Sequence, residues 1–323
     1  MTKISVVIPT YNRAAYLDQA ITSVLSQTNA DFEVVISDNC SQDETVAVVS
    51  RYLADPRVRY YRNEQNIGMV RNWHKAVFEL AVGEWFMLLS DDDYLVDPEY
   101  LAKASRLIEG DSSLVMVYAG GYLLDENTGR KETLNLPFAG IVDGVDVFVS
   151  RNTVKPLDFT LCNVVFNRKL ARELNGFSNP DNLSCDSELF LKMAILGHVG
   201  VINEPVSVYR FHSGNLLKKI IRSPDLMYGN MEHLVSPYLF ARNRIRPEQM
   251  ETFKKNTTLG RFVTNTLLLV ACYSWGKFLK YREETLSAVP ELSLAEMQTL
   301  KFRIKLLICR IGGRAVPVIM GKI

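Results

Sequence analysis

Short apolar runs alternate with helical patterns over the first two hundred residues, and this alternation constrains the fold more than any other feature of the chain. The runs that predict buried strands are Ile4–Ile8, Phe32–Ser37, Val58–Tyr61 and Trp85–Leu89. Between them, a first helical pattern runs through Leu17, Ile21, Val24 and Leu25, and a second covers Met69–Leu80. Strands that alternate with helices predict an α/β fold with a mostly parallel sheet.

The pattern changes near residue 216. Before it, helices are predicted at Arg168–Leu174 and Asp186–Leu196, each ending at a glycine, and strands at Val199–Ile202 and Val206–Phe211. After it, only helical patterns follow. We therefore expect an α/β domain over residues 1–215 and a helical region over residues 216–323.

Composition excludes several classes of protein. The 323 residues are 47% hydrophobic and carry a formal net charge of +1, so we expect no nucleic-acid partner. The five cysteines are scattered and form no C-x-x-C pair, which predicts neither a disulfide framework nor a zinc site and favours a reducing cytosol. The longest apolar stretch, Thr266–Tyr273, is far shorter than the ~20 residues of a membrane span. We expect a protein that is soluble or lies on a membrane surface.

Three consecutive carboxylates, Asp91, Asp92 and Asp93, follow the predicted strand Trp85–Leu89. Adjacent carboxylates repel one another, and oxygen-rich sites of this kind suit Mg²⁺ or Mn²⁺ that bridges substrate phosphates. In open α/β sheets, ligands bind outside the carboxyl ends of the strands, where this cluster and Asp38 both lie. The alternative for the cluster is a solvated acidic loop or a helix cap before Pro98.

Five further motifs accompany the aspartate run. They are Val6-Val7-Ile8-Pro9-Thr10-Tyr11-Asn12-Arg13, Asp38-Asn39-Cys40-Ser41-Gln42-Asp43-Glu44-Thr45, Asn66-Ile67-Gly68-Met69-Val70-Arg71-Asn72, and the pair Cys185-Asp186-Ser187-Glu188-Leu189 and Tyr209-Arg210-Phe211-His212. In this order and spacing the motifs resemble the family 2 glycosyltransferases, over about residues 3 to 215. The resemblance implies a GT-A fold, a Rossmann-like α/β catalytic domain, with a helical C-terminal extension.

The resemblance also implies roles for individual residues. The residues that would bind the nucleotide-sugar are Pro9, Thr10, Tyr11, Arg13, Asp38, Asn66, Gly68, Arg71 and Asp91. Tyr11 would stack on the base, and Asp38 and Arg71 would hydrogen-bond the base edge or the ribose. Asp92, with Asp93 and His212, would hold Mn²⁺ or Mg²⁺. Asp186 would be the catalytic base that takes the proton of the acceptor hydroxyl.

Each of these residues also has a plain structural interpretation. The alternatives are an Asx-turn for Asp38, a surface helix position for Arg71, a helix cap for Asp186, a structural histidine for His212 and core packing for Tyr11. Ser90 and Cys185 depart from the family pattern, because relatives often have Asp and Glu there. The Q-x-x-R-W element of processive synthases is absent, which favours the addition of a single sugar.

The implied activity is an inverting, metal-dependent transfer of one sugar from a nucleotide-sugar, with a UDP-sugar as the default donor, to an acceptor hydroxyl in bacterial surface polysaccharide or O-antigen-type assembly. The alternatives are a catalytically inactive relative that binds a glycan or nucleotide, and a nucleotidyltransferase of sugar phosphates. The nucleotidyltransferase needs a glycine-rich loop after the first strand, where this chain has Pro9–Arg13. A dinucleotide dehydrogenase is excluded because no G-x-G-x-x-G follows a strand.

The C-terminal region ends in a basic amphipathic pattern. One helical face carries Leu300, Ile304, Leu307, Ile308 and Ile311, flanked by Lys301, Arg303, Lys305 and Arg310. Such a helix suits an anionic membrane interface, where a lipid-linked glycan acceptor would be found. The alternative is that the stripe packs on the catalytic domain or on a second subunit of a homo-oligomer. We expect a cytoplasmic protein, peripheral at the inner face of the cell membrane.

Overall fold

The computed structural model describes residues 3–28, 31–134, 136–151, 160–212 and 223–312. The chain forms two compact units. The first comprises residues 1–180 and 189–215, and the second comprises residues 181–188 and 216–323. The division at residue 215 coincides with the change in sequence pattern, but the segment Asp181–Glu188 groups with the second unit.

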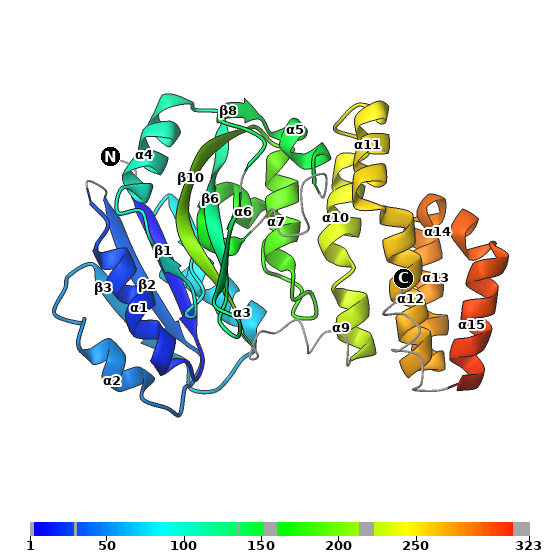
Figure 1. Cartoon of the computed structure of the whole chain (residues 1–323), viewed down its shortest axis with the longest axis horizontal. Coiled ribbons are helices and arrows are strands. Elements are labelled where there is room, and N and C mark those ends of the chain that lie inside the picture. Colours follow the sequence, from blue (N-terminus) through cyan, green and yellow to red (C-terminus); the bar gives the residue numbers. More distant parts are fainter. Residues whose placement is uncertain (1–2, 29–30, 135, 152–159, 213–222, 313–323) are drawn as a thin grey trace. The chain divides into compact units, whose positions relative to one another are not determined.

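Four parallel strands form one half of the sheet in the first unit. They are β1 (Ile4–Thr10), β2 (Phe32–Asp38), β3 (Val58–Arg62) and β4 (Trp85–Leu88), in the order β3-β2-β1-β4. In Figure 1, β1, β2 and β3 lie side by side. Every residue of β1, β2 and β4 is buried, which explains why these strands are mostly apolar on both faces rather than alternating.

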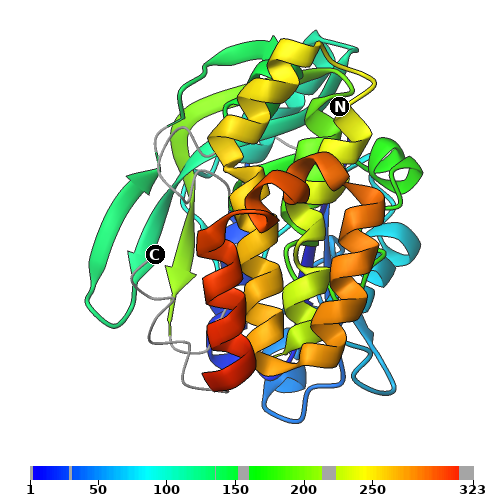
Figure 2. The same ribbon diagram turned by 90° about the vertical axis from the view of Figure 1, so that its right-hand side faces the viewer.

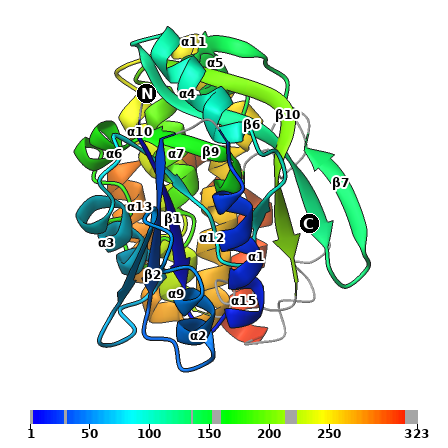
Figure 3. The same ribbon diagram turned by 90° about the vertical axis from the view of Figure 1, so that its left-hand side faces the viewer.

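The other half of the sheet is mixed. Its strands are β5 (Tyr94–Leu95), β6 (Leu114–Asp125), β7 (Arg130–Leu134), β8 (Gly140–Asp143), β9 (Val164–Asn167) and β10 (His198–Phe211). Strand β9 runs antiparallel between β4 and β6, β10 runs parallel to β6, and β7 pairs with β6 as an antiparallel hairpin (Figures 2 and 3). The prediction of a mostly parallel sheet therefore holds only for the first four strands.

Apolar layers cover both faces of the sheet. On one face, Ile4, Val6 and Ile8 of β1 join a buried cluster with residues of α1 (Ala14–Leu25) and α4 (Tyr100–Gly110). On the other, aromatic rings of Phe78, Phe86, Phe166 and Phe177 pack against one another. The period of two along β1 thus divides its side chains between two buried layers.

The remaining helices of the first unit are short. They are α2 (Thr45–Ser50), α3 (Met69–Lys75) with the π-helical turn Ala76–Leu80, α5 (Gly144–Val149), the 3-10 turn Leu161–Asn163 and α6 (Arg168–Glu173). Helix α7 (Cys185–Ala194) begins in the segment that groups with the second unit.

The second unit contains a helical bundle, in addition to the segment Asp181–Glu188 with the first turn of α7. Its helices are α9 (Pro224–Gly229), α10 (Glu232–Ala241), α11 (Pro247–Thr257), α12 (Leu259–Tyr273), α13 (Trp275–Ala288), α14 (Pro290–Met297) and α15 (Leu300–Gly312). Helix α12 packs against α9, α13, α14 and α15, and Figure 2 shows α12 between its neighbours. None of the helices in the described ranges is both long and apolar enough to cross a membrane.

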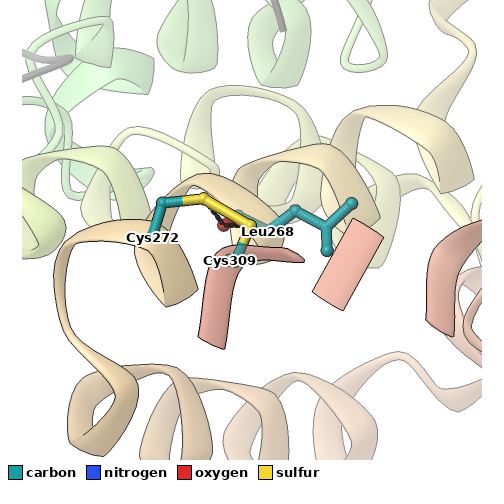
Figure 4. The surroundings of a disulfide bond; sticks show 3 residues. All are labelled: Leu268, Cys272 and Cys309. Atoms are coloured by element: carbon teal, nitrogen blue, oxygen red, sulfur yellow. Dashed lines mark hydrogen bonds between the residues drawn. A yellow bond between two sulfur atoms is a disulfide. The ribbon is translucent and has the colours of Figure 1, made fainter. Parts of the chain in front are cut away.

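The second unit contains a disulfide, which the scattered cysteines of the sequence did not predict. Cys272 of α12 and Cys309 of α15 form a disulfide, with their Cα atoms 4.6 Å apart, next to the carbonyl of Leu268 (Figure 4). Cys40, Cys162 and Cys185 are free thiols. The sequence did not predict the bond, because the two cysteines lie on different helices and are separated by 37 residues.

Candidate active site

The aspartate run lies where the strand order of the sheet reverses. The chain proceeds from β1 outward to β2 and β3, and then returns to the other side of β1 with β4. Pairing between β1 and β4 ends at Val7 and Leu88, so the two strands part before Pro9, which has no N–H to donate. Across this opening the backbone N–H of Tyr11 faces Asp91 Oδ2 at 3.4 Å. Such a switch point is where open α/β sheets bind ligands.

The loop after β1 is held in place by the loop after β2. The backbone N–H of Asn12 donates to Ser41 Oγ at 2.9 Å, and Asn12 Oδ1 accepts from the backbone N–H of Gln42 at 2.8 Å. Asn12 has φ of +54°, a left-handed conformation that asparagine tolerates. These bonds order the segment that carries Tyr11, whose side chain is 44% exposed, and Arg13.

Asp38 holds the loop after β2 through hydrogen bonds of its carboxylate. Its carboxylate is fully buried, accepts from the Ser41 backbone N–H at 2.8 Å and from the Tyr60 hydroxyl at 2.7 Å, and lies 3.5 Å from Arg62 Nε. Burial and the bond to Asp38 raise the pKa of Tyr60, which keeps that hydroxyl a donor. The structure thus turns Asp38 toward protein groups, as in the Asx-turn alternative.

An amide network connects β2 to α3. Asn39 Nδ2 donates to Asn66 Oδ1, and Asn66 Oδ1 also accepts from the Gly68 backbone N–H, both at 2.9 Å. Asn72 Oδ1 accepts from Ser37 Oγ and from Asn63 Nδ2, both at 2.8 Å.

Gly68 has φ of +87° immediately before α3, a conformation that favours glycine. Asn66 and Gly68 therefore set where α3 begins, and Arg71 lies exposed in its first turn.

The three consecutive aspartates have three different environments. Asp91 is buried, and burial together with the neighbouring Asp92 raises the pKa of Asp91 to about 7. Asp93 is also buried, and Oδ1 accepts a hydrogen bond from the backbone N–H of Arg210 at 2.9 Å. Burial and Asp92 raise the pKa of Asp93 well above its usual range. Asp92 alone is partly open to solvent, with its side chain 15% exposed.

Asp92 meets His212 at the end of β10. Asp92 Oδ2 and His212 Nε2 are 2.9 Å apart, although 120 residues separate them in sequence. The guanidinium of Arg13 joins them, with Nη1 3.0 Å from His212 Nε2 and 3.4 Å from Asp92 Oδ2. The carboxylate, the imidazole and the guanidinium therefore share one small volume at the switch point.

A second set of side chains orients His212. The ring of Tyr16 stacks on the imidazole with centroids 5.4 Å apart, and the Tyr16 hydroxyl donates to Glu126 Oε2 at 2.9 Å. Glu126 Oε1 accepts from Arg210 Nη1 at 2.7 Å, and the Arg210 guanidinium lies 5.2 Å from the Tyr16 ring centroid. The Tyr16–Glu126–Arg210 set thus holds the ring that faces Asp92.

The Asp92–His212 pair has a spacing that fits a divalent cation. Two neighbouring ligands of an octahedral ion at about 2.05 Å lie about 2.9 Å apart, and such ions take one or two protein ligands and complete their shell with water and substrate phosphates. Among the described side chains, no three His, Cys, Asp or Glu residues gather closely enough to enclose a metal. The donor set therefore suits a metal held jointly by the protein and a substrate phosphate.

Asp186 lies in the first turn of α7, in the segment that groups with the second unit. The positive end of the helix dipole favours the ionised form of a carboxylate there. In the same turn, Glu188 Oε2 accepts from Asn182 Nδ2 at 2.7 Å. Asp186 is the second residue of α7, so it lies within the first helical turn and not at the cap position before Cys185.

Several residues that shape the site were not predicted. Tyr16 stacks on His212, Asn39 donates to Asn66, and the Arg210 backbone donates to Asp93. Glu126 acts indirectly through Tyr16 and Arg210, and Asn63 acts through Asn39 and Asn72. Arg210 and Asn39 fall inside motifs that were recognised. Glu126 follows β6, which no recognised motif covers, so sequence carried no signal for it.

Comparison with known proteins agrees with this arrangement. The family model for glycosyl transferase family 2 matches residues 5–173. A GalNAc(5)-diNAcBac-PP-undecaprenol beta-1,3-glucosyltransferase of Campylobacter jejuni is 33% identical over 155 residues, which are 43% of this chain and 50% of the relative. The poly(ribitol-phosphate) beta-N-acetylglucosaminyltransferase TarS of Staphylococcus aureus is 31% identical over 119 residues, 36% of this chain and 21% of TarS. The aligned part thus spans half or less of these two named relatives.

Solved structures share the fold. The crystal structure of S. aureus TarS residues 1–349 in complex with UDP-GlcNAc matches with a TM-score of 0.64 at 18% identity, over 95% of this chain and 89% of that one. The mannosyltransferase PcManGT of Pyrobaculum calidifontis, in complex with GDP-Man and Mn²⁺, matches with a TM-score of 0.55 at 18% identity, over 95% and 86% of the two chains. With a switch-point site in an α/β sheet and a family match across more than half of its length, the chain belongs to glycosyl transferase family 2 and has the GT-A fold.

Proposed function

We propose that the protein is an inverting, metal-dependent glycosyltransferase that adds one sugar from a nucleotide-sugar to an acceptor hydroxyl. The observation that carries the proposal is the Asp92–His212 pair, with Oδ2 and Nε2 2.9 Å apart at the switch point of the sheet. Family membership supports the reaction class. A UDP-sugar is the proposed donor, because TarS, which shares the fold, binds UDP-GlcNAc.

Donor binding would rest on the ordered loops. The exposed ring of Tyr11 is available to stack on the base, and the exposed Arg71 side chain to reach the base edge or ribose. Asp38, Asn66 and Gly68 would act through the backbone they position rather than by direct contact. A divalent ion, Mn²⁺ or Mg²⁺, would be held by Asp92 and His212 and would neutralise charge on the departing diphosphate.

The acceptor side would depend on Asp186. A hydroxyl is a weak nucleophile until a carboxylate takes its proton, and Asp186 lies in the first turn of α7, where a carboxylate meets the positive end of the helix dipole. One base and one displacement at the anomeric carbon leave the product with inverted configuration. This assignment carries over from the family motif at Cys185–Leu189.

The helical region is proposed to bring the enzyme to a lipid-linked glycan at the inner face of the cell membrane, in the cytoplasm. In α15, Phe302 and Cys309 are buried, whereas Ile304 and Leu307 point outward with 50% and 55% of their surface exposed. Exposed cations, Lys301, Arg303 and Arg310, flank these two apolar side chains. Leu300, Ile308 and Ile311 of the predicted stripe lie outside the described side chains. An outward apolar strip between cations suits an anionic lipid surface.

A thermal-shift panel tests the donor proposal. UDP, GDP, CDP and dTDP are each added with Mn²⁺ or with EDTA, and ligand binding to the folded state raises the melting temperature. We expect one nucleotide, UDP, to stabilise the protein selectively and only with Mn²⁺. Equal stabilisation in EDTA would reject the metal requirement, and stabilisation by none of the four would favour a relative that no longer binds a donor.

A further inference from the structure

The guanidinium of Arg13 lies against the two side chains that would hold a metal ion. Its Nη1 atom lies 3.0 Å from His212 Nε2 and 3.4 Å from Asp92 Oδ2, which are themselves 2.9 Å apart. An arginine nitrogen only donates hydrogen bonds, and Nη1 carries two hydrogens. One hydrogen can point to the imidazole and the other to the carboxylate, so a single nitrogen of the cation is within reach of both side chains.

Two tautomers of the imidazole fit this arrangement. With the ring proton on Nδ1, Nε2 accepts from Arg13 and carries the lone pair that binds a metal. With the proton on Nε2, the imidazole donates to Asp92 Oδ2 at 2.9 Å instead. In either tautomer, the Arg13 guanidinium lies beside both of the proposed metal ligands.

We propose that Arg13 is an exchangeable cation: it neutralises the Asp92–His212 pair in the enzyme without substrate and leaves that pair when a divalent ion arrives with the nucleotide-sugar. In the exchanged state its guanidinium pairs with the donor diphosphate, for which arginine is well suited. The inference rests on the metal dependence of the proposed function and assigns a regulatory step to the same site.

Charge explains why metal and donor would bind together. A divalent ion alone must displace the Arg13 guanidinium and then lie close to that positive charge, so like charges oppose its binding. A nucleoside diphosphate supplies the negative charge that both cations need. The Arg13 side chain is 25% exposed, and the backbone on either side is fixed by Asn12 and by the Ala14 N–H, which donates to Asp43 Oδ2 at 3.0 Å. The side chain can therefore swing while the loop stays in place.

Mn²⁺ binding measured by electron paramagnetic resonance tests the proposal without any need for turnover. The free-ion signal is titrated with the full chain, with and without UDP, for wild type, Arg13→Gln and Arg51→Gln. Arg51 is an exposed arginine of the first unit that pairs with Asp18 at 2.9 Å, so its variant controls for the loss of one positive charge.

We expect Arg13→Gln to bind Mn²⁺ alone about 5- to 10-fold more tightly than wild type, since one charge-assisted contact no longer competes. The factor by which UDP tightens Mn²⁺ binding should shrink in the same variant, and Arg51→Gln should match wild type. Arg13→Lys, which keeps the charge but has a shorter side chain without the planar guanidinium, should lie between.

Unchanged or weaker Mn²⁺ binding by Arg13→Gln, with a normal melting temperature, would overturn the exchange while leaving metal-dependent transfer intact. Should Arg13→Gln unfold, Arg13→Lys decides the question by the same comparison. If no variant and no wild-type sample binds Mn²⁺ even with UDP, the proposed metal site itself is wrong, and the exchange is rejected with it.

Discussion

The Asp93 carboxylate accepts a hydrogen bond from the backbone N–H of Arg210 at 2.9 Å, across 117 residues of sequence. This bond joins the aspartate loop to the end of strand β10, two residues before His212. It therefore brings His212 opposite Asp92 and separates the roles of two neighbouring acids. Asp93 holds the backbone, and Asp92 faces the site.

Asp93→Asn tests this division of roles. The amide oxygen of asparagine can still accept from Arg210, and the raised pKa of Asp93 means that the fold favours a neutral side chain there. We expect Asp93→Asn to keep Mn²⁺ affinity within about 3-fold of wild type, and Asp93→Ala to weaken it by about 10-fold or more because His212 loses its position. A loss in Asp93→Asn as large as that in Asp92→Asn would make Asp93 a direct ligand, as the sequence predicted.

The raised pKa of Asp91 predicts a pH dependence of stability without metal. The folded pKa is about 7, and the ordinary value is 3.8. Between these values the folded state holds a proton that the unfolded state has released, so this group's contribution to stability falls as pH rises and levels off above about 7. In EDTA, the melting temperature of Asp91→Asn minus that of wild type should grow by about 4 °C from pH 5.5 to pH 8. A constant difference would show that Asp91 does not titrate in this range.

Asp186→Asn tests the catalytic base. The substitution keeps size and removes basicity, so it should lower kcat by about 10²–10⁴-fold and leave UDP and Mn²⁺ affinity unchanged. Glu188→Gln is the matched control, because Glu188 lies in the same turn and bonds to Asn182. Loss of UDP binding in Asp186→Asn would place the residue on the donor side, and a retained anomeric configuration in the product, read by proton NMR, would reject single displacement.

The exposed face of α15 predicts membrane binding. A double variant, Ile304→Ser with Leu307→Ser, should bind vesicles of phosphatidylcholine and phosphatidylglycerol, mixed at ~7:3, about 10-fold less tightly than wild type. Leu279→Ser of α13 controls for the loss of an exposed leucine, since its side chain is 47% exposed. Wild-type binding should also weaken with salt. Absence of vesicle binding, together with a wild-type dimer that the double variant abolishes, would assign this face to self-association.

Sequence alone predicted the fold best where one local signal decided the structure. The strands β1, β2 and β4 were found because every one of their positions is buried and most are apolar, and α3 because its helical period is clear. Strand β10 was predicted as two strands, because Asn203 and Glu204 interrupt the apolar pattern. The structure absorbs this interruption as a register shift between Ile202 and Pro205.

Roles that depend on distant partners escaped prediction. The family resemblance grouped Asp92 and Asp93 with His212, and the folded chain does bring Asp92 to His212 but turns Asp93 to the Arg210 backbone. Helix α15 has apolar residues on two faces, and periodicity does not say which face packs inward. In the structure, Phe302 and Cys309 pack inward, whereas Ile304 and Leu307 are exposed.

Nucleoside diphosphate release from UDP-sugars by the full chain tests the central claim most directly. With Mn²⁺, we expect the protein to release UDP from one UDP-sugar of a panel, in transfer or in slow hydrolysis by water. EDTA should stop this release, added Mn²⁺ should restore it, and Asp92→Ala should show none, since one ligand of the proposed metal is lost. Release that continues unchanged in EDTA or in Asp92→Ala would contradict a metal-dependent glycosyltransferase built on the Asp92–His212 pair.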